Sequence, residues 1–259
     1  MVITYEDRDY IGIHVGIYRL NNSMDDYNIN IACVIHGNGY SWEYVDKLYN
    51  MVSRNLTVPV VFHVYTEESR DVPEYMVKHS LIPWNGIQDK YAWWYKMQLF
   101  NSEHYSGPLL YFDLDVVITD SIDWVWQLPT HCLWAIKDFK ALWRPNFMGI
   151  NSSMMWWDTT VYHHIWKRFS KCHLPTITGM YKGDQDYLSD VIPTSSRRFF
   201  EGGVKSWRWE VVQGGYDFAL KSYRDVNAAP NVNDTSVIIC HGEPKPHQIN
   251  DQIIFENWR

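Results

Sequence analysis

The stretch from Gly107 to Ile118 constrains the fold of this chain more than any other. A Gly-Pro pair, which favours a turn, precedes the apolar run 109–112, and two aspartates, Asp113 and Asp115, follow that run. A short run made only of apolar residues is typical of a buried strand in a mostly parallel sheet. The two carboxylates therefore fall at the carboxyl end of a central strand, where open α/β sheets bind their ligands.

Two carboxylates this close together repel each other unless a cation or a shared proton joins them. A hard divalent ion, bound by carboxylate oxygens and by the phosphates of a substrate, satisfies them most simply. A turn that contains two aspartates by chance is the alternative interpretation, and the apolar residues on both sides of the pair speak against it. We therefore predict a divalent metal site that includes Asp113 and Asp115.

Composition and charge narrow the class of protein. The 259 residues fit one large α/β domain or two small ones, and the net charge of −7 gives no overall attraction to nucleic acid. No run of about 18 apolar residues is present to span a bilayer, and the acidic N-terminal residues do not resemble a signal peptide. Cys33 and Cys240 lie in apolar runs, which suits free thiols in a reducing compartment. We expect a cytoplasmic protein with no integral membrane segment.

The order of apolar patterns along the chain predicts alternating strands and helices. Residues 1–27 are expected to form a peripheral extension or hairpin before the main fold. Strands are expected at 29–35, 58–65, 81–84, 109–112, 133–136 and 237–240, with a further apolar segment at 147–157. Helices are expected after a capping Ser41 and at 89–101, 159–170 and 187–191. This order is the β-α-β pattern of a nucleotide-binding half, although neither a G-x-G-x-x-G nor a Walker motif is present.

Four short motifs then occur in one order along the chain. They are Tyr111–Asp115 (Y-F-D-L-D), the segment 147–155 with Asn151-Ser152-Ser153, Asp184–Leu188 (D-Q-D-Y-L) and Gly242–Pro246 (G-E-P-K-P). In this order they resemble the D-x-D, N-[AS]-G-[VM], D-Q-D-x-L and G-x-x-K-P motifs of the metal-dependent glycosyltransferases of the GT-A fold. The chain is most similar to the retaining group that includes glycogenin and the bacterial lipopolysaccharide galactosyltransferases.

The resemblance implies a single α/β domain of the GT-A type, with a central, mostly parallel sheet and D-x-D at a strand end. Residues 28–127 would form the nucleotide-binding half and residues 128–259 the acceptor-side half. The implied activity is transfer of a hexose from a nucleotide-diphosphate sugar, a UDP-sugar, to an acceptor hydroxyl with retention.

The resemblance also assigns roles to individual residues. Asp113, Asp115 and His241 would hold Mn²⁺ or Mg²⁺, and the imidazole favours Mn²⁺. The donor would contact Tyr40, Lys96, Asn151, Gly242 and Lys245. The residues expected at the reaction centre are Asp184, Gln185 and Asp186. Two positions depart from the family, because Ser153 stands in place of a glycine and Ile239 in place of the metal-binding histidine. His241 lies next to Gly242 instead, so its role as a ligand requires a different backbone path.

Several of these residues have simpler interpretations. Lys96 fits an exposed position on an amphipathic helix, Tyr40 a turn, Lys245 a solvated loop and Asp186 a helix cap. The basic and aromatic segment 197–209 fits a lid over the diphosphate, an acceptor platform or a solvated surface loop. At the reaction centre, a neutral Gln185 is a poor nucleophile, so attack by the acceptor hydroxyl on the face of the leaving phosphate is favoured over a covalent intermediate.

The acceptor and the class of protein each leave alternatives. A glycan is the expected acceptor, and a hydroxylated base in DNA is the alternative, because the segment 197–209 could take a flipped base. A phosphohydrolase of the haloacid dehalogenase type also places D-x-D after an apolar strand, but normally on its first strand. A non-catalytic carbohydrate-binding relative is the third class, and the intact acidic motifs speak against it.

Overall fold

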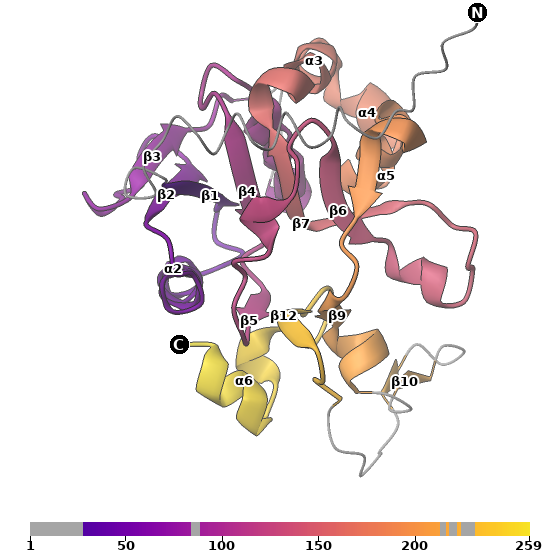
Figure 1. The fold of residues 1–259 in the computed structure, drawn as a ribbon. Coiled ribbons are helices and arrows are strands. Elements are labelled where there is room, and N and C mark those ends of the chain that lie inside the picture. Colours follow the sequence, from indigo (N-terminus) through magenta and orange to yellow (C-terminus); the bar gives the residue numbers. More distant parts are fainter. Residues whose placement is uncertain (1–27, 84–88, 213–215, 218–221, 224–230) are drawn as a thin grey trace, which may run out of the picture.

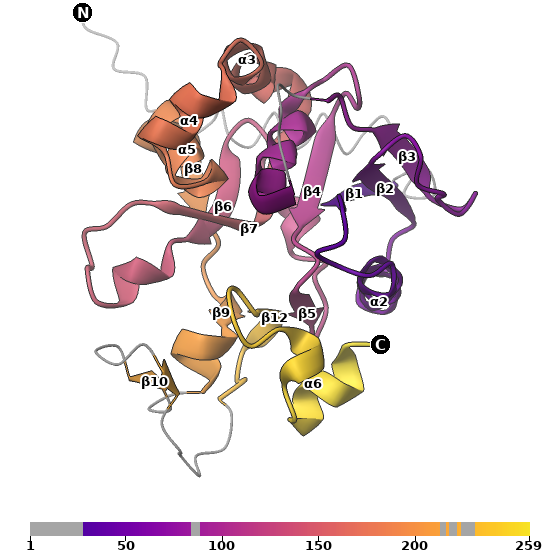
Figure 2. The same ribbon diagram turned by 180° about the vertical axis from the view of Figure 1, so that it is seen from behind.

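The computed structural model of this chain describes residues 28–83, 89–212, 216–217, 222–223 and 231–259. The extension or hairpin predicted for residues 1–27 lies outside the described residues. Within these ranges the chain forms a seven-stranded sheet, a three-stranded sheet and a two-stranded pair, with helices packed around them (Figures 1 and 2). No helix in this part of the chain is long and apolar enough to cross a membrane.

The larger sheet has seven strands in the order β3-β2-β1-β4-β7-β6-β8. Only β7 runs antiparallel to its two neighbours, and the other neighbouring pairs are parallel. The predicted α/β class with a mostly parallel sheet is therefore confirmed, and the strand before the two aspartates, β4, is central. The strands are β1 (Ile29–Val34), β2 (Val60–Thr66), β3 (Val77–Ser80), β4 (Pro108–Phe112), β6 (Leu133–Lys137), β7 (Ile150–Asp158) and β8 (Arg197–Phe199).

A smaller sheet has the order β5-β12-β9 and lies below the larger one in Figure 1. Its strands are β5 (Val116–Ile118), β9 (Gly203–Ser206) and β12 (Thr235–Ile239), and a further pair is β10 (Tyr216–Asp217) with β11 (Ser222–Tyr223). The chain passes from the larger to the smaller sheet between β4 and β5, at Asp113-Leu114-Asp115. The two aspartates therefore lie where the two sheets meet.

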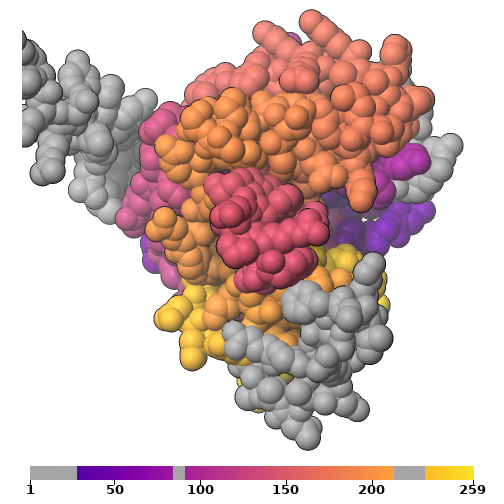
Figure 3. Space-filling model, turned by 90° about the vertical axis from the view of Figure 1, so that its right-hand side faces the viewer, coloured from indigo at the N-terminus to yellow at the C-terminus, as the bar shows by residue number. Residues whose placement is uncertain are grey.

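The helices cover both faces of the larger sheet. The segment between β6 and β7, which includes η4, stands out at the surface between the region of α4 and α5 and the smaller sheet (Figures 1 and 3). The longer helices are α2 (Glu43–Arg54), η2 (Asp89–Phe100), α3 (Thr159–Phe169), α4 (Leu174–Met180), α5 (Asp184–Val191) and α6 (Gln252–Asn257). The short turns are η3 (Val125–Gln127), η4 (Phe139–Leu142), η5 (Thr194–Ser196), η6 (Trp207–Val211) and η7 (Pro246–Gln248).

The alternation of side chains along β4 divides the core in two. Leu110 and Phe112 belong to the cluster that contains α2 and the smaller sheet, whereas Leu109 and Tyr111 belong to the cluster that contains η2, α3 and α5. Successive side chains of a strand point to opposite faces, and this period explains the division. Asp113 follows Tyr111 by two positions, so the strand directs its carboxylate toward the face that η2 and α5 cover.

Most predicted elements are confirmed, and three are corrected. Ser41 does not cap α2, because the residue before the helix is Trp42 and no side chain caps it. The edge strand predicted at 81–84 lies earlier, at Val77–Ser80, where it pairs with His63–Thr66; the described residues after it, up to Pro83, leave the sheet. Residues 197–209 are not one solvated loop, because they form β8, β9 and the start of η6.

The cysteines in the described residues are free, as expected. Cys33 and Cys240 are both buried, and burial raises the pKa of each thiol. Neither thiol is therefore a reactive thiolate near neutral pH.

A cluster of histidines connects the edge of the larger sheet to the loop after η2. The Nδ1 of His63 lies 2.8 Å from the Nε2 of His79, and the Nε2 of His63 lies 3.0 Å from the Oδ1 of Asn30. His79 stacks on Tyr65 with a ring distance of 4.5 Å, and His104 packs against both rings. Burial lowers the pKa of His63 to about 4, and burial together with the charges of its two histidine neighbours lowers that of His79 to about 4.

We expect this cluster to make the fold sensitive to acid. Because the folded-state pKa values lie below the ordinary value of about 6.5, the unfolded chain binds more protons as the pH falls. The contribution of the cluster to stability is therefore fully present above pH 6.5, and it is lost as the pH falls toward about 4. Urea unfolding at pH 7 and pH 5 measures this loss. His63→Gln should reduce the difference between the two pH values, whereas His164→Gln, on the exposed face of α3, should leave it unchanged. An equal pH dependence in the wild type and in His63→Gln would contradict the prediction.

Candidate functional site

A cleft of about 570 Å³ opens at the carboxyl ends of β1 and β4. Segments far apart in the sequence line it: the loop after β1, the helix η2, the two aspartates after β4, strand β7, the start of α5 and the loop after β12. The predicted site residues that line it are Tyr40, Lys96, Asp113, Asp115, Asp184, Gln185, His241 and Gly242.

Lys96 joins two of the acidic motifs at the bottom of the cleft. Its Nζ lies 2.8 Å from the Oδ1 of Asp113 and 3.3 Å from the Oδ2 of Asp184. Burial alone would lower the pKa of this ammonium, but the charges of the two aspartates raise it above its ordinary value, so Lys96 carries a charge at every physiological pH. Only 7% of Lys96 is exposed, so its interpretation as a solvated helix residue is wrong.

Ser152 and Tyr111 complete this hydrogen-bond network. The Ser152 hydroxyl accepts from the Lys96 ammonium at 3.0 Å and donates to the Oδ2 of Asp184 at 2.5 Å. The Tyr111 hydroxyl donates to the Oδ1 of Asp113 at 2.5 Å. Burial would raise the pKa of Asp113, but the charge of Lys96 and the hydrogen bonds from Lys96, Tyr111 and Ser153 lower it below its ordinary value. Asp113 is therefore an anion whose orientation is fixed from two sides.

Asp115 has a different set of partners. The Lys245 ammonium lies 2.5 Å from its Oδ2, and the Tyr40 hydroxyl donates to the same oxygen at 3.0 Å. Burial and the negative charge of Asp113 raise the pKa of Asp115 above its ordinary value, against the opposing effect of Lys245 and Tyr40. Lys245 is thus bound to a carboxylate, and its interpretation as a solvated lysine is wrong.

Backbone hydrogen bonds hold the aspartates against the neighbouring motifs. The amide of Asp113 donates to the carbonyl of Ser153 at 2.8 Å, and the amide of Cys240 donates to the carbonyl of Asp115 at 3.2 Å. The first bond extends the pairing of β4 with β7, and the second extends the pairing of β5 with β12. Sheet pairing therefore sets the position of the D-x-D segment relative to β7 and to the loop after β12.

His241 lines the cleft but has another partner. Its Nε2 lies 2.8 Å from the Oγ of Ser206, and its ring stacks on Phe139 at 4.9 Å. Burial and the charges of Arg208 and Lys245 lower the pKa of His241 to about 4, so the imidazole is neutral at pH 7. Among the described residues, no three His, Cys, Asp or Glu side chains come together as a group that could hold a metal ion. The ligand set with His241 as its third member therefore stays a prediction.

The two aspartates by themselves fit a divalent ion. Carboxylate oxygens are the ligands that hard cations prefer, and Mg²⁺ is commonly bound by one or two carboxylates together with the phosphates of a substrate. Asp113 and Asp115 provide such a pair at one wall of the cleft. Oxygens of a bound ligand would have to fill the remaining positions.

The other predicted residues have mainly local partners. Asn151 is buried in β7, where its Oδ1 accepts from the amide of Ser153 at 3.1 Å. Asp186 lies in the first turn of α5 and accepts from the amide of Lys182 at 3.2 Å. Gly242 has a φ of +71°, and a Cβ there would meet the Arg208 guanidinium at 3.2 Å, which explains the glycine. Their roles toward a ligand stay predictions.

Several residues of the site were not identified from the sequence, and Tyr111, Ser152, Trp93 and Lys182 are among them. Tyr111 shares a strand face with Asp113, and the i, i+2 spacing could have indicated this contact. Ser152 contacts Lys96 and Asp184 across long sequence separations, for which the sequence contains no signal. Trp93, which is 43% exposed, and Lys182 also line the cleft. In sequence they are indistinguishable from surface residues.

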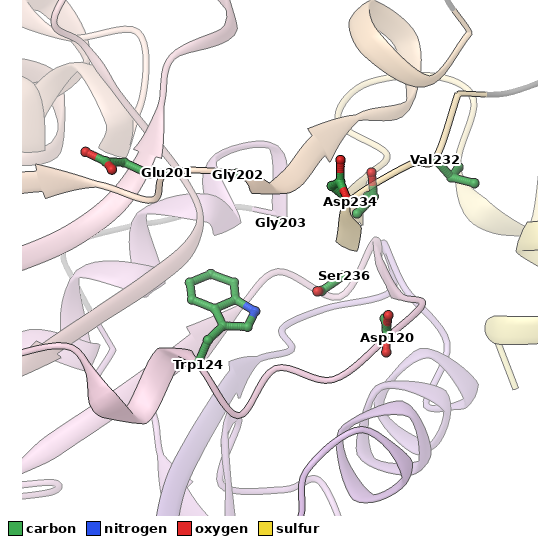
Figure 4. A pocket seen from close by; sticks show the side chains of 9 residues that line it. Asp120, Trp124, Glu201, Gly202, Gly203, Val232, Asp234 and Ser236 are labelled. Carbon is green, nitrogen blue, oxygen red and sulfur yellow. The ribbon is translucent and has the colours of Figure 1, made fainter.

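A second cavity, of about 370 Å³, lies outside this cleft and shares none of its lining residues. Figure 4 shows it between the ends of β9 and β12 and the segment after β5, with the indole of Trp124 and the carboxylates of Asp120, Glu201 and Asp234 around it. A carboxylate-rich cavity with one aromatic ring does not define a ligand.

Comparison with known proteins shows the fold. No protein-family profile matches the chain, and no curated protein matches it in sequence. The galactosyltransferase LgtC, solved with donor and acceptor sugar analogs, superposes with a TM-score of 0.57 at 15% identity, over 88% of this chain and 96% of LgtC. The glycosyltransferase GlyE of Streptococcus pneumoniae TIGR4 superposes with a TM-score of 0.62 at 12% identity, over 89% of this chain and 62% of GlyE. The bifunctional glycosyltransferase WbbM superposes with a TM-score of 0.55 at 11% identity, over 87% of this chain and 48% of WbbM. The chain has the GT-A fold that its motifs predicted.

We expect Lys96 to be required for the stability of the cleft. Lys96→Met leaves Asp113 and Asp184 without their shared cation, and removal of one partner of a buried ion pair costs roughly 3–5 kcal/mol. Urea unfolding at pH 7 measures the loss of unfolding free energy. Lys140→Met removes the exposed pair with Asp138 and serves as the matched control, with an expected change of about 0–1 kcal/mol. Equal losses in the two variants would contradict the assignment.

Proposed function

We propose that this protein transfers a hexose from a nucleoside-diphosphate sugar, a UDP-sugar, to a hydroxyl of a glycan acceptor with retention of configuration. One observation carries the proposal: Asp113 and Asp115 share a cleft with Asp184 and Gln185, and Lys96 links the two motifs at its bottom. The GT-A fold supports it, since the similar solved structures are glycosyltransferases.

The aspartates and lysines suit a diphosphate leaving group. A divalent ion held by Asp113 and Asp115 would supply Lewis-acid stabilisation of the departing nucleoside diphosphate. Lys245 brings a point charge to the same wall of the cleft. Tyr40 lines the cleft beside Asp115, and an aromatic ring at this position offers a surface on which the base of a nucleotide would stack. Residues 28–127 would thus bind the nucleotide, and residues 128–259 would face the sugar and the acceptor.

The reaction centre favours attack without a covalent intermediate. Gln185 is neutral, and the Oδ2 of Asp184 is already held by Ser152 and Lys96, so neither side chain is an effective nucleophile. The acceptor hydroxyl would then attack on the face that the phosphate leaves, with the phosphate oxygen as its base. LgtC has been crystallised as an active-site mutant in which a glutamine is changed to glutamate, so the active site of that protein contains a glutamine.

A glycan is the acceptor that the described cleft favours. The exposed indole of Trp93 lines the cleft next to Gly183, and a flat apolar ring is a suitable surface for a sugar. The segment 197–209, on which the alternative of a DNA base rested, forms β8, β9 and the start of η6. Arg197 is buried and donates to the carbonyl of Ser189, and Arg208 donates to that of Glu243. No contact of this segment favours nucleic acid.

The phosphohydrolase alternative is disfavoured by the topology. Haloacid dehalogenases carry the D-x-D on the first strand, whereas here it follows β4, after three other strands of the same sheet. A catalytically inactive carbohydrate-binding protein would not need Lys96 and Lys245 each bound to an aspartate of the cleft.

The proposal predicts release of UDP from one UDP-sugar in the presence of Mn²⁺ or Mg²⁺ and an acceptor. Asp115→Asn, which keeps the size of the side chain, should lower kcat by at least about 10²-fold, because it removes a charge worth several kcal/mol to the leaving group. Asp71→Asn, on the surface, is the control and should have wild-type activity. NMR of the product anomer tests retention, and a labelled donor added to a cell lysate identifies the class of acceptor. No turnover of any UDP-sugar with either ion would overturn the proposal.

A further inference from the structure

Glu67 and Arg70 form an ion pair directly after β2. The Nε of Arg70 lies 2.9 Å from the Oε2 of Glu67, and its Nη2 lies 3.0 Å from the Oε1. Two N–H groups that meet two carboxylate oxygens fix the orientation of both side chains as well as their distance. The hydroxyl of Thr66, the last residue of β2, donates to the same Oε2 at 2.7 Å. The pair is therefore held firmly at the end of a core strand.

Both members of the pair also contact one residue of the loop after β1. The amide of Gly37 donates to the Oε1 of Glu67 at 2.5 Å, and the carbonyl of Gly37 accepts from the Nη2 of Arg70 at 2.7 Å. Gly37 has a φ of +64°, a left-handed conformation that favours glycine. The pair thus holds the peptide groups on both sides of the Gly37 Cα in this conformation.

The loop that is held in this way forms part of the cleft. It lies between the end of β1 and the start of α2, and its residues that line the cleft are His36, Asn38, Gly39 and Tyr40. Glu67 and Arg70 do not belong to the lining of the cleft. They can therefore act on a ligand only through the loop.

The charges of the pair are set by its contacts. Burial would raise the pKa of Glu67, but the hydrogen bonds from Arg70, Thr66 and the backbone amides lower it well below its ordinary value. The hydrogen bond to Glu67 raises the pKa of Arg70. The two side chains are 23% and 24% exposed, and ion pairs in contact with solvent add little to the stability of a fold. Their effect on the loop is therefore separable from an effect on the fold.

We propose that Glu67 and Arg70 are positioning residues for the donor, which hold the loop after β1 in the conformation that receives the nucleoside. The proposal rests on the proposed function, because it takes a nucleoside diphosphate as the ligand. A loop that is ordered before binding does not cost the ligand the free energy of ordering it. Tyr40, three residues after Gly37, is the side chain that this order places beside Asp115.

Glu67→Gln tests the proposal, because glutamine has one acceptor oxygen where Glu67 uses two. Amide hydrogen exchange in a peptide that covers residues 36–42 should become about tenfold faster, since the loop opens more often. The Kd of UDP, measured by calorimetry with Mn²⁺ present, should rise about tenfold. The KM for the UDP-sugar should rise by the same factor while kcat changes less than about threefold, which is the signature of lost uniform binding.

Glu68→Gln is the matched control. It makes the same substitution at the next residue, which is exposed and accepts from Ser80 of β3 instead of the loop. Exchange, UDP affinity and kinetics should equal those of the wild type. Arg70→Lys serves as the second variant if Glu67→Gln is unfolded by circular dichroism. It keeps the charge but loses the planar fork, so it should change the same quantities in the same direction.

The outcomes separate a positioning role from a structural one. If the urea midpoint falls and the amides of β1 exchange faster together with the loop, the pair stabilises the fold in general and the inference is overturned. Equal exchange of residues 36–42 in Glu67→Gln and Glu68→Gln overturns it as well, as does faster exchange with an unchanged UDP affinity. If the wild type binds neither UDP nor GDP with Mn²⁺ present, the proposed function is overturned, and the exchange rates still decide whether the pair holds the loop.

Discussion

The buried ammonium of Lys96 is the interaction on which the architecture of the cleft depends. It lies between Asp113, after β4, and Asp184, at the start of α5, and Ser152 of β7 bridges the contact. Removing charges from water is unfavourable, so such a group stabilises a fold only when every polar atom has a partner. Here one ammonium satisfies two carboxylates and a hydroxyl. Because the desolvated ammonium is stable only while all of these contacts are made, it fixes the relative positions of η2, β4, β7 and α5.

Backbone pairing within the sheets positions these groups independently of their side-chain contacts. Because side chains alternate along a strand, Tyr111 in β4 and Asp113 directly after it point to the same face of the sheet. Backbone hydrogen bonds from Asp113 to Ser153 and from Cys240 to Asp115 connect the aspartates to β7 and β12. The chain leaves the larger sheet for the smaller one between Asp113 and Asp115. The two carboxylates therefore differ in their surroundings, and this difference explains why burial and repulsion raise the pKa of Asp115 while Lys96 lowers that of Asp113.

Local pattern predicted the strands, the longer helices and the acidic motifs, because each depends on residues close in sequence. The apolar run 109–112 and the D-Q-D segment are of this kind. The partners of these motifs depend on contacts between distant residues: Lys245 lies 130 positions from Asp115, and Ser152 lies 32 from Asp184. No local signal marks a serine in a buried strand as the bridge between a lysine and an aspartate. The prediction of a cap at Ser41 failed in a similar way, because Ser41 is a good capping residue but lies one position before Trp42, the residue at the N-cap of α2.

The counter-ions of the cleft also restrict what can bind in it. The carboxylates of Asp113, Asp115 and Asp184 would repel one another without positive charges nearby. Lys96 and Lys245 offset two of the three negative charges, so that these five groups have a net charge of −1. A ligand set that disturbs this balance loses part of its binding free energy to uncompensated charge, and one that preserves it does not. An anion and a divalent cation of equal and opposite charge preserve it, whereas either alone does not. The lysines bound to these aspartates are for this reason also the groups that set the charge that a ligand of the cleft must match.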